Sequence, residues 1–166
     1  MNKYTKGFLA VVGFGVALAY AGGDLKIYDV VLPIENCQSG CPNNSYYVDN
    51  KTNLMWEDTG FSDASDGAYK KDRSACKAGD LSHAKNYCAT LNYAGYTDWR
   101  LPTSDELMEV SKQSKVFKNN RGADFWTSTP GDVGKYYVVF TVDGFRYDRP
   151  TSQSNYIRCV RCVGKK

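Results

Sequence analysis

Short segments of alternating apolar and polar residues recur along the chain. "SYYVDNKTNLMWED" predicts two short strands around the polar turn "DNKTN", and "DLKIYDVVLPI" is long enough to form one more strand. Near the C-terminus, "DFWTST", "KYYVVFTV", "GFRYD" and "NYIRCVRCV" alternate in the same way, with a turn at "VDG" between the second and the third. Residues 57–80 have no periodicity and are expected to form a long loop.

Two helices are predicted in the middle of the chain. In "LSHAKNYCATL", apolar residues recur at helical spacing: Leu81, Ala84, Cys88 and Leu91. Asp80 or Ser82 is the expected N-cap of this first helix. The order of strands, two helices and more strands, joined by long loops, predicts an α+β domain.

The second helix starts inside "LPTSDEL". Thr103 is its expected N-cap, and Glu106 three residues later completes a capping box. Pro102 before the cap and Leu107 after it are placed for a hydrophobic staple, and Leu107 and Val110 can face the core. This stretch therefore has a sufficient structural explanation as a helix start.

The first 21 residues have the pattern of a secretory signal peptide. "MNKYTK" is basic, "GFLAVVGFGVALA" is an apolar run, and "AYA" offers small residues to a signal peptidase. A membrane anchor is the alternative, but it needs about 20 apolar residues, and Gly13 and Gly15 interrupt this run. Cleavage after Ala21 would remove Lys3 and Lys6 and lower the net charge from +3 to +1.

Length and composition fit one folded, exported domain. The 166 residues are 14% aromatic, with 13 Tyr, which is not the composition of a disordered chain. Export leads to the periplasm or to the cell surface and extracellular space, with no membrane span after cleavage. The nearly neutral mature chain gives no reason to expect a nucleic-acid partner.

Six cysteines follow the cleavage point: Cys37, Cys41, Cys76, Cys88, Cys159 and Cys162. An even number of cysteines in an exported chain favours disulfides over zinc, although "CQSGC" and "CVRC" could form two ligand pairs. A thioredoxin-like reading of "CVRC" is weaker, because that chemistry places the first cysteine at a helix N-terminus and "YIRCVRCV" alternates like a strand.

Five blocks resemble one protein family in their order along the chain: "YVDNKTNLMW", "LSHAKNYCATLNYAGYTDWRLPTSDELMEV", "FWTST", "YYVVFTVDG" and "YIRCVRC". The family is the bacterial Lcl C-terminal domain family, whose function is largely unknown and which was named for the tail of a collagen-like adhesin. The resemblance covers about residues 46–163. The chain then divides into a signal peptide (1–21), an extension (22–45), this domain (46–163) and a tail (164–166).

The resemblance implies a variant of the C-type lectin fold, with two helices beside small twisted antiparallel sheets. It also implies a disulfide from the first helix to the last strand, here Cys88 to Cys159. Cys159 and Cys162 point to opposite faces of an extended strand, so they should not share a partner region. We therefore expect Cys76 to pair with Cys162, and Cys37 with Cys41.

"DWR" at residues 98–100 tempts a catalytic interpretation, but a Trp beside a helix cap usually packs in the core, and Asp and Arg usually fasten loops. We therefore assign a structural role to six residues of the shared blocks: Trp56, Trp99, Arg100, Thr103, Glu106 and Trp126. His83, the single His, has no "GxSxG" nucleophile motif to serve. We expect no catalytic residues.

An enzyme remains an alternative, because "RLPTSDEL" is also similar to a helix start in formylglycine-generating enzymes, which share the lectin-like fold. Fold kinship alone does not imply function. We expect no cofactor and no metal. Acids do gather in "EDTGFSDASDG", at Glu57, Asp58, Asp63 and Asp66, but their spacing matches no Ca²⁺ loop.

Two surfaces are candidates for recognition. Lys112, Lys115, Lys118 and Arg121 recur every third residue without an intervening acid, which at helical or tight-turn spacing would give one basic face. Such a face attracts an anionic partner, although a solvated surface is the simpler explanation. The second surface is "DGFRYDRPTSQSNY", where Arg146, Tyr147 and Arg149 are of types favoured in binding sites.

The sequence thus predicts an exported, disulfide-stabilised binding module, adhesin-like in the role we expect. Its partner would be a glycan, an anionic polymer or a surface protein, contacted through the loops within residues 111–155. The alternatives are an enzyme on the same fold and a structural envelope or filament subunit. The last would self-associate, and oligomerisation is compatible with all three.

Overall fold

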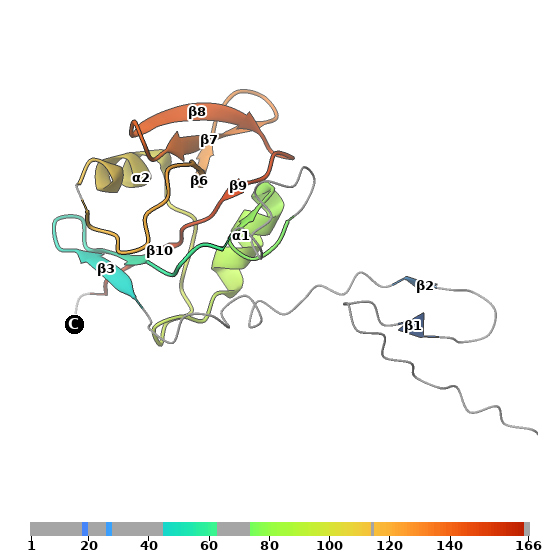
Figure 1. Cartoon of the computed structure of the whole chain (residues 1–166), viewed down its shortest axis with the longest axis horizontal. Helices are drawn as coiled ribbons and strands as arrows, with labels where there is room; N and C mark the ends of the chain where they lie inside the picture. The colour runs from blue at the N-terminus through green and yellow to red at the C-terminus, as the bar shows by residue number, and fades with distance from the viewer. Residues whose placement is uncertain (1–17, 20–25, 28–44, 63–73, 114, 165–166) are drawn as a thin grey trace, which may run out of the picture.

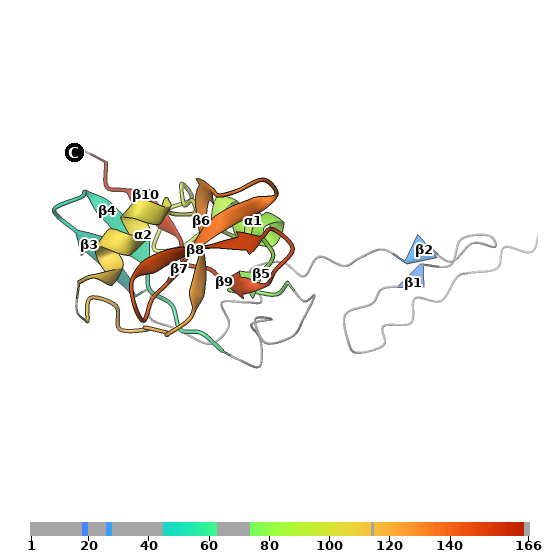
Figure 2. The same ribbon diagram turned by 90° about the horizontal axis from the view of Figure 1, so that it is seen from above.

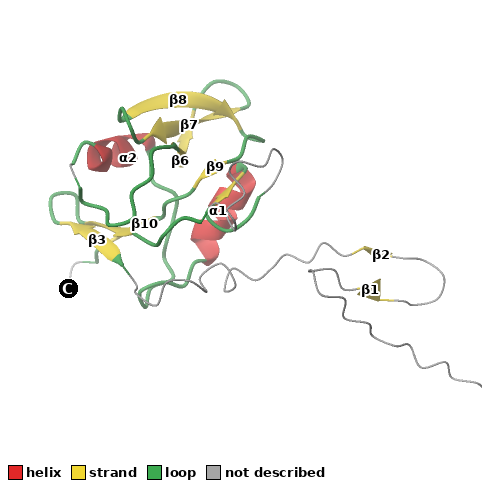
Figure 3. Cartoon of the chain, in the orientation of Figure 1, coloured by secondary structure: helices red, strands yellow, loops and turns green. Residues whose placement is uncertain are grey.

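The computed structural model describes residues 18–19, 26–27, 45–62, 74–113 and 115–164. These residues form two helices, two small sheets and an isolated strand pair, β1 (Leu18–Ala19) with β2 (Lys26–Ile27). In Figure 1, β7 and β8 lie at the top of the domain, β3 and β10 lie below them, and α2 and α1 lie on the left and the right; Figure 3 shows how much of the domain consists of connecting loops. The α+β class predicted from the order of elements is confirmed. The predicted cleavage point lies outside the described residues.

The smaller sheet has three antiparallel strands in the order β10 (Val160–Cys162), β4 (Leu54–Glu57) and β3 (Tyr46–Asp49). The β3–β4 hairpin is the one predicted around "DNKTN". All four residues of β4 are buried, because β4 is the central strand and is covered on both faces.

The larger sheet has five strands in the order β5 (Ala78–Gly79), β9 (Asn155–Tyr156), β6 (Asp124–Pro130), β7 (Lys135–Phe140) and β8 (Phe145–Pro150). Two features were not predicted. β5 lies inside the expected loop, and β9 runs parallel to β6 in a sheet that is otherwise antiparallel. The segment expected as one last strand is two, since the chain leaves this sheet after β9 and enters the smaller sheet as β10.

The first helix, α1 (Leu81–Thr90), is capped by Asp80, whose carboxylate accepts a hydrogen bond from the His83 backbone N–H at 2.8 Å. The second helix, α2 (Ser104–Ser111), begins with the predicted capping box of Thr103 and Glu106. Seen from above in Figure 2, α2 lies toward the three-stranded sheet and α1 toward β5 and β9.

The helices pack on opposite faces of the five-stranded sheet. Trp126 and Val138 join the apolar cluster of α1, whereas their neighbours Phe125 and Val139 join the cluster of α2. This division follows from the strand geometry, because consecutive side chains of a strand point to opposite faces. Neither helix has the length or the hydropathy to cross a bilayer.

The disulfide between Cys88 and Cys159, with Cα atoms 5.5 Å apart, confirms the pairing that the family resemblance implied. The predicted Cys76–Cys162 pairing is wrong. Cys76 is disulfide-bonded, but Cys162 is a free, exposed thiol. The reason is topological: Cys76 precedes the edge strand β5 of one sheet and Cys162 ends the edge strand β10 of the other. The predicted Cys37–Cys41 bridge lies outside the described residues.

The residues of "DWR" join separate parts of the scaffold. Trp99 is buried, and its indole N–H donates to the backbone carbonyls of Tyr93 and Tyr96 at 3.3 and 3.1 Å. Arg100 forms two hydrogen bonds to the Glu106 carboxylate, at 2.6 and 2.8 Å. Asp98 and Arg100 do not pair with each other, since Asp98 accepts two bonds from the guanidinium of residue 161. Trp56 in β4 and Trp126 in β6 are fully buried.

Candidate functional site

A cleft of about 560 Å³ opens beside the larger sheet, where β6 begins and β7 ends. Its lining includes Asp124, Phe140, Asp143, Tyr147, Arg149 and Asn155. The volume is in the range of small-molecule sites, and aromatic faces combined with a few fixed polar groups are typical of such sites.

An ion pair forms one wall of the cleft. The Arg149 Nε donates to Asp124 Oδ2 at 2.8 Å, and the two side chains are 32% and 18% exposed. The Arg149 guanidinium also lies 5.5 Å from the ring centroid of Tyr147. The alternation of β8 causes this arrangement, because residues 147 and 149 share one face. The pair holds Arg149 in place while leaving part of its guanidinium open to a ligand.

The β7–β8 turn fixes the rim. The Tyr147 hydroxyl donates to Asp143 Oδ2 at 2.7 Å, while Asp143 Oδ1 accepts the Phe145 backbone N–H at 2.8 Å. The turn closes through Gly144, whose φ of 74° suits glycine. The hydrogen bond to the Asp143 carboxylate is the main reason why the pKa of Tyr147 is raised, so its hydroxyl stays protonated.

The cleft lining includes the amide of Asn155, whose nitrogen has no hydrogen-bond partner among the described residues. Asn155 is 4% exposed and its Oδ1 accepts from Gln153 Nε2 at 3.1 Å. Its Nδ2 is buried and makes no hydrogen bond within the part of the chain that the structure describes. A buried donor of this kind is costly, so a ligand acceptor at the cleft floor would be favourable.

Helix α2 does not extend through the four basic residues predicted as one face. It ends at Ser111, and residues 112–113 and 115–121 lie in turns, bends and loop. Lys112 pairs with Glu109 at 3.6 Å, and Lys115 and Lys118 have exposed side chains. Arg121 leads into the cleft: its guanidinium lies 4.5 Å from the ring centroid of Tyr156, a cleft residue.

Of the second predicted surface, Tyr147 and Arg149 line the cleft and Arg146 does not. Arg146 points to the opposite face of β8, where its Nη1 lies 3.3 Å from Ser104 Oγ and 3.4 Å from Asp105 Oδ1. Period-two alternation was the signal that could have separated these residues.

Four cleft residues were not singled out from the sequence. Asp124 and Phe140 lie outside the second predicted surface, whereas Asp143 and Asn155 lie at its two ends, and the folded sheet brings all four together. Asp143, in the predicted turn "VDG", was the one that the sequence could have indicated, because Asp often binds the backbone two residues on.

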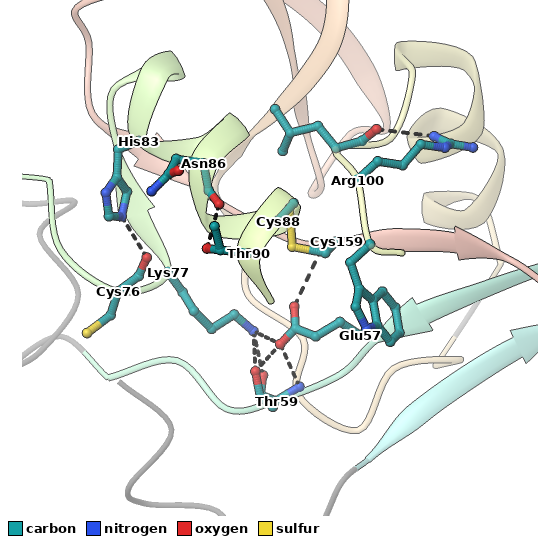
Figure 4. Close-up of a disulfide and its surroundings, with 12 residues drawn as sticks. Glu57, Thr59, Cys76, Lys77, His83, Asn86, Cys88, Thr90, Arg100 and Cys159 are labelled. Atoms are coloured by element: carbon teal, nitrogen blue, oxygen red, sulfur yellow. Dashed lines mark hydrogen bonds and ion pairs between the residues drawn. A yellow bond between two sulfur atoms is a disulfide. The ribbon is translucent and has the colours of Figure 1, made fainter. Parts of the chain in front are cut away.

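Two of the acids considered for calcium are committed to buried ion pairs. Lys77 Nζ lies 2.6 Å from Glu57 Oε1, and Arg158 Nη1 lies 3.2 Å from Asp58 Oδ1 (Figure 4 shows the first pair beside the disulfide). All four side chains are at most 4% exposed. Thr59 donates two further hydrogen bonds to Glu57, one from its backbone and one from its hydroxyl. Asp63 and Asp66 lie outside the described residues.

The charges in this cluster shift the pKa values of Glu57 and Arg158. Burial alone would raise the pKa of Glu57, but the charges of Lys77 and Arg158 and the hydrogen bonds of Lys77 and Thr59 lower it below its ordinary value. Burial lowers the pKa of Arg158, against the effect of Glu57 and Asp58. These opposed charges join β4 to the passage between β9 and β10, so the cluster fastens the two sheets together.

His83 and Cys162, which were weighed for catalysis in the sequence, lie in different parts of the structure. The His83 Nε2 contacts the backbone carbonyl of Cys76 at 2.9 Å, while the free thiol of Cys162 ends β10 in the other sheet. Neither residue lines the cleft.

A profile of the Lcl C-terminal domain family matches residues 45–161. The match covers most of the chain and all the elements from β3 to β9, so the protein belongs to this family. A search of curated proteins found no match. The disulfide within the matched region is consistent with an exported protein.

Proposed function

We propose that this protein is an exported binding module that recognises a glycan through the cleft beside β8. The main supporting observation is the cleft itself, which is lined by the Tyr147 ring, the partly exposed Arg149 and Asn155, whose amide nitrogen has no partner among the described residues. Sugar hydroxyls both donate and accept hydrogen bonds, which matches a mixture of carboxylate acceptors and amide and guanidinium donors. The C-type-lectin-like fold implied by the family supports the same reading.

The basic loop extends the proposed site. Residues 112–121 directly precede the cleft-lining residues 122–124, and Arg121 stacks on a cleft tyrosine. Anionic groups on a glycan would find Lys115 and Lys118 exposed along this loop. The proposed ligand is therefore a glycan that carries negative charge, presented at the cell surface or in the periplasm.

A glycan array tests the proposal. Wild type should bind a set of related glycans, and Tyr147→Ala should lose that binding while melting at the same temperature, because Tyr147 is 40% exposed. Tyr46→Ala is the matched control, since Tyr46 is similarly exposed at 52% but belongs to β3 in the other sheet. Equal glycan binding by wild type and both variants would move the site away from the cleft.

A further inference from the structure

The strand β8 forms one edge of the larger sheet. Within the described residues, β7 is the only strand that pairs with β8, and Figure 1 shows β8 along the outer side of the domain. Phe145 and Tyr147 on this strand are 62% and 40% exposed. An unpaired edge with exposed aromatic side chains is a template for adding another strand.

The backbone of β8 has outward-facing hydrogen-bonding groups. Thr141, directly after β7, donates its backbone N–H to the carbonyl of Ala123, directly before β6. The N–H and C=O groups of odd-numbered residues along β7 therefore point toward β6, and those of even-numbered residues point toward β8. Their partners on β8 are odd-numbered, which leaves Arg146 and Asp148 directing their N–H and C=O groups away from the sheet. The Asp148 carbonyl accepts from Arg149 Nη1 at 3.2 Å and retains a second lone pair.

The sequence of β8 is complementary to itself in one antiparallel register. When two copies of β8 pair through a twofold axis, residues directly opposite each other carry their side chains on the same face of the sheet. The axis can therefore pass through residue 146, 147 or 148 of β8. An axis at Arg146 or at Asp148 would place like charges opposite each other, which is destabilising. An axis at Tyr147 places Arg146 opposite Asp148 twice, Phe145 opposite Arg149 twice, and the two Tyr147 rings side by side.

We propose that two copies of this chain associate through β8, in the register centred on Tyr147. The Arg146–Asp148 positions are then the hydrogen-bonded pairs, which gives four backbone hydrogen bonds across the interface. The Arg146 side chain is 45% exposed, and its contacts with Ser104 and Asp105, at 3.3 and 3.4 Å, are long enough for it to exchange them for Asp148 of the second copy. Asp148 Oδ1 has no hydrogen-bond partner in the described structure, so a cation from the second copy would compensate a buried charge.

This pairing would form a continuous ten-stranded sheet. A twofold axis perpendicular to a sheet keeps the same face of both copies on one side, so the two clefts would open on that side. The charged residues that set the register, Arg146 and Asp148, project from the face opposite to the clefts, whereas Tyr147 and Arg149 contribute both to the interface and to the cleft lining.

Sedimentation analysis over a concentration series tests the pairing. Every variant carries Cys162→Ser, so that the free thiol cannot form a disulfide between copies. The parent should dimerise, and Arg146→Glu or Asp148→Lys should each raise the dissociation constant by roughly tenfold or more, because two attractive pairs become repulsive. The double variant Arg146→Glu/Asp148→Lys exchanges the charges within each pair and should restore most of the affinity.

Two further variants control the result. Lys112→Glu makes the same charge change as Arg146→Glu, but at the end of α2, and should leave association unchanged. Arg146→Pro removes an outward N–H without removing a bond to β7, so it should be monomeric with an unchanged melting temperature. A parent that stays monomeric, or a double variant no tighter than the single variants, overturns the proposal.

Discussion

Replacing Lys77 with methionine removes the cation from a buried ion pair and leaves the Glu57 carboxylate behind. The Lys77 ammonium lies 2.6 Å from Glu57 Oε1, donates to the Thr59 carbonyl at 3.0 Å, and sits 3.8 Å from the centroid of the Phe61 ring. Breaking a buried pair by removing one partner costs about 3–5 kcal/mol. Arg158 and Thr59 still stabilise the carboxylate, so we expect a loss of about 3 kcal/mol in the free energy of unfolding.

A double variant separates the cost of a stranded charge from that of altered packing. Glu57→Gln keeps an acceptor for the Thr59 N–H but carries no charge. In Lys77→Met/Glu57→Gln, much of the lost stability should therefore return. Urea unfolding at neutral pH, with the disulfides intact, gives the free energies of unfolding of wild type, the two single variants and the double variant. A single-variant loss below about 1 kcal/mol, or a double variant less stable than Lys77→Met, would refute a strong ion pair here.

The same carboxylate gives a pH dependence. The folded-state pKa of Glu57 lies below its ordinary value of 4.5, so its ionised form stabilises the fold above that pH. This contribution is lost as the pH falls through the depressed folded-state pKa. Wild type should therefore lose stability on acidification below about pH 4.5, and Glu57→Gln should lose less over the same range.

Three further predictions concern the scaffold and the basic loop. Cys88→Ser should lower the free energy of unfolding by about 4 kcal/mol in chemical denaturation, because its disulfide closes a loop with a sequence separation of 71; a loss near zero would contradict this role. Thr103→Ala should cost about 1 kcal/mol in thermal unfolding through loss of the cap, whereas Thr103→Ser should not. Lys115→Glu with Lys118→Glu should elute from a heparin-like column at lower salt than wild type, because exposed charges are screened over about 8 Å at physiological ionic strength. Charge reversal at residues 165–166 is the control, and co-elution of both variants with wild type would argue against the basic loop.

Local signals in the sequence predicted the local structure well. Thr103 and Glu106 lie three residues apart, so their capping box is readable without tertiary information, as is the cap at Asp80. The β3–β4 hairpin and the β7–β8 pair follow from alternation around polar turns. Only the family resemblance, and not any spacing, indicated the disulfide between Cys88 and Cys159.

Long-range contacts were beyond the reach of these signals. "NYIRCVRCV" alternates as one strand, yet it divides because Arg158 must reach Asp58 and the Glu57 carbonyl, about 100 positions earlier in the chain. The basic residues after α2 were expected at helical or tight-turn spacing, but α2 ends at Ser111, and the Asp58 carboxylate accepts the Lys118 backbone N–H in the loop that follows. Spacing carries no information about a partner that folding brings from elsewhere.

The distribution of buried charge agrees with the proposal that recognition occurs at β8. The Glu57 cluster and the disulfide of Cys159 fasten the junction of the two sheets, while Trp126 and Val138 anchor the inner part of the larger sheet. The β7–β8 hairpin extends beyond these fixed points, and its exposed Phe145 contributes little to the core. Side chains on this hairpin can therefore change without loss of the fold, which is the condition under which a binding surface can diverge on a constant scaffold.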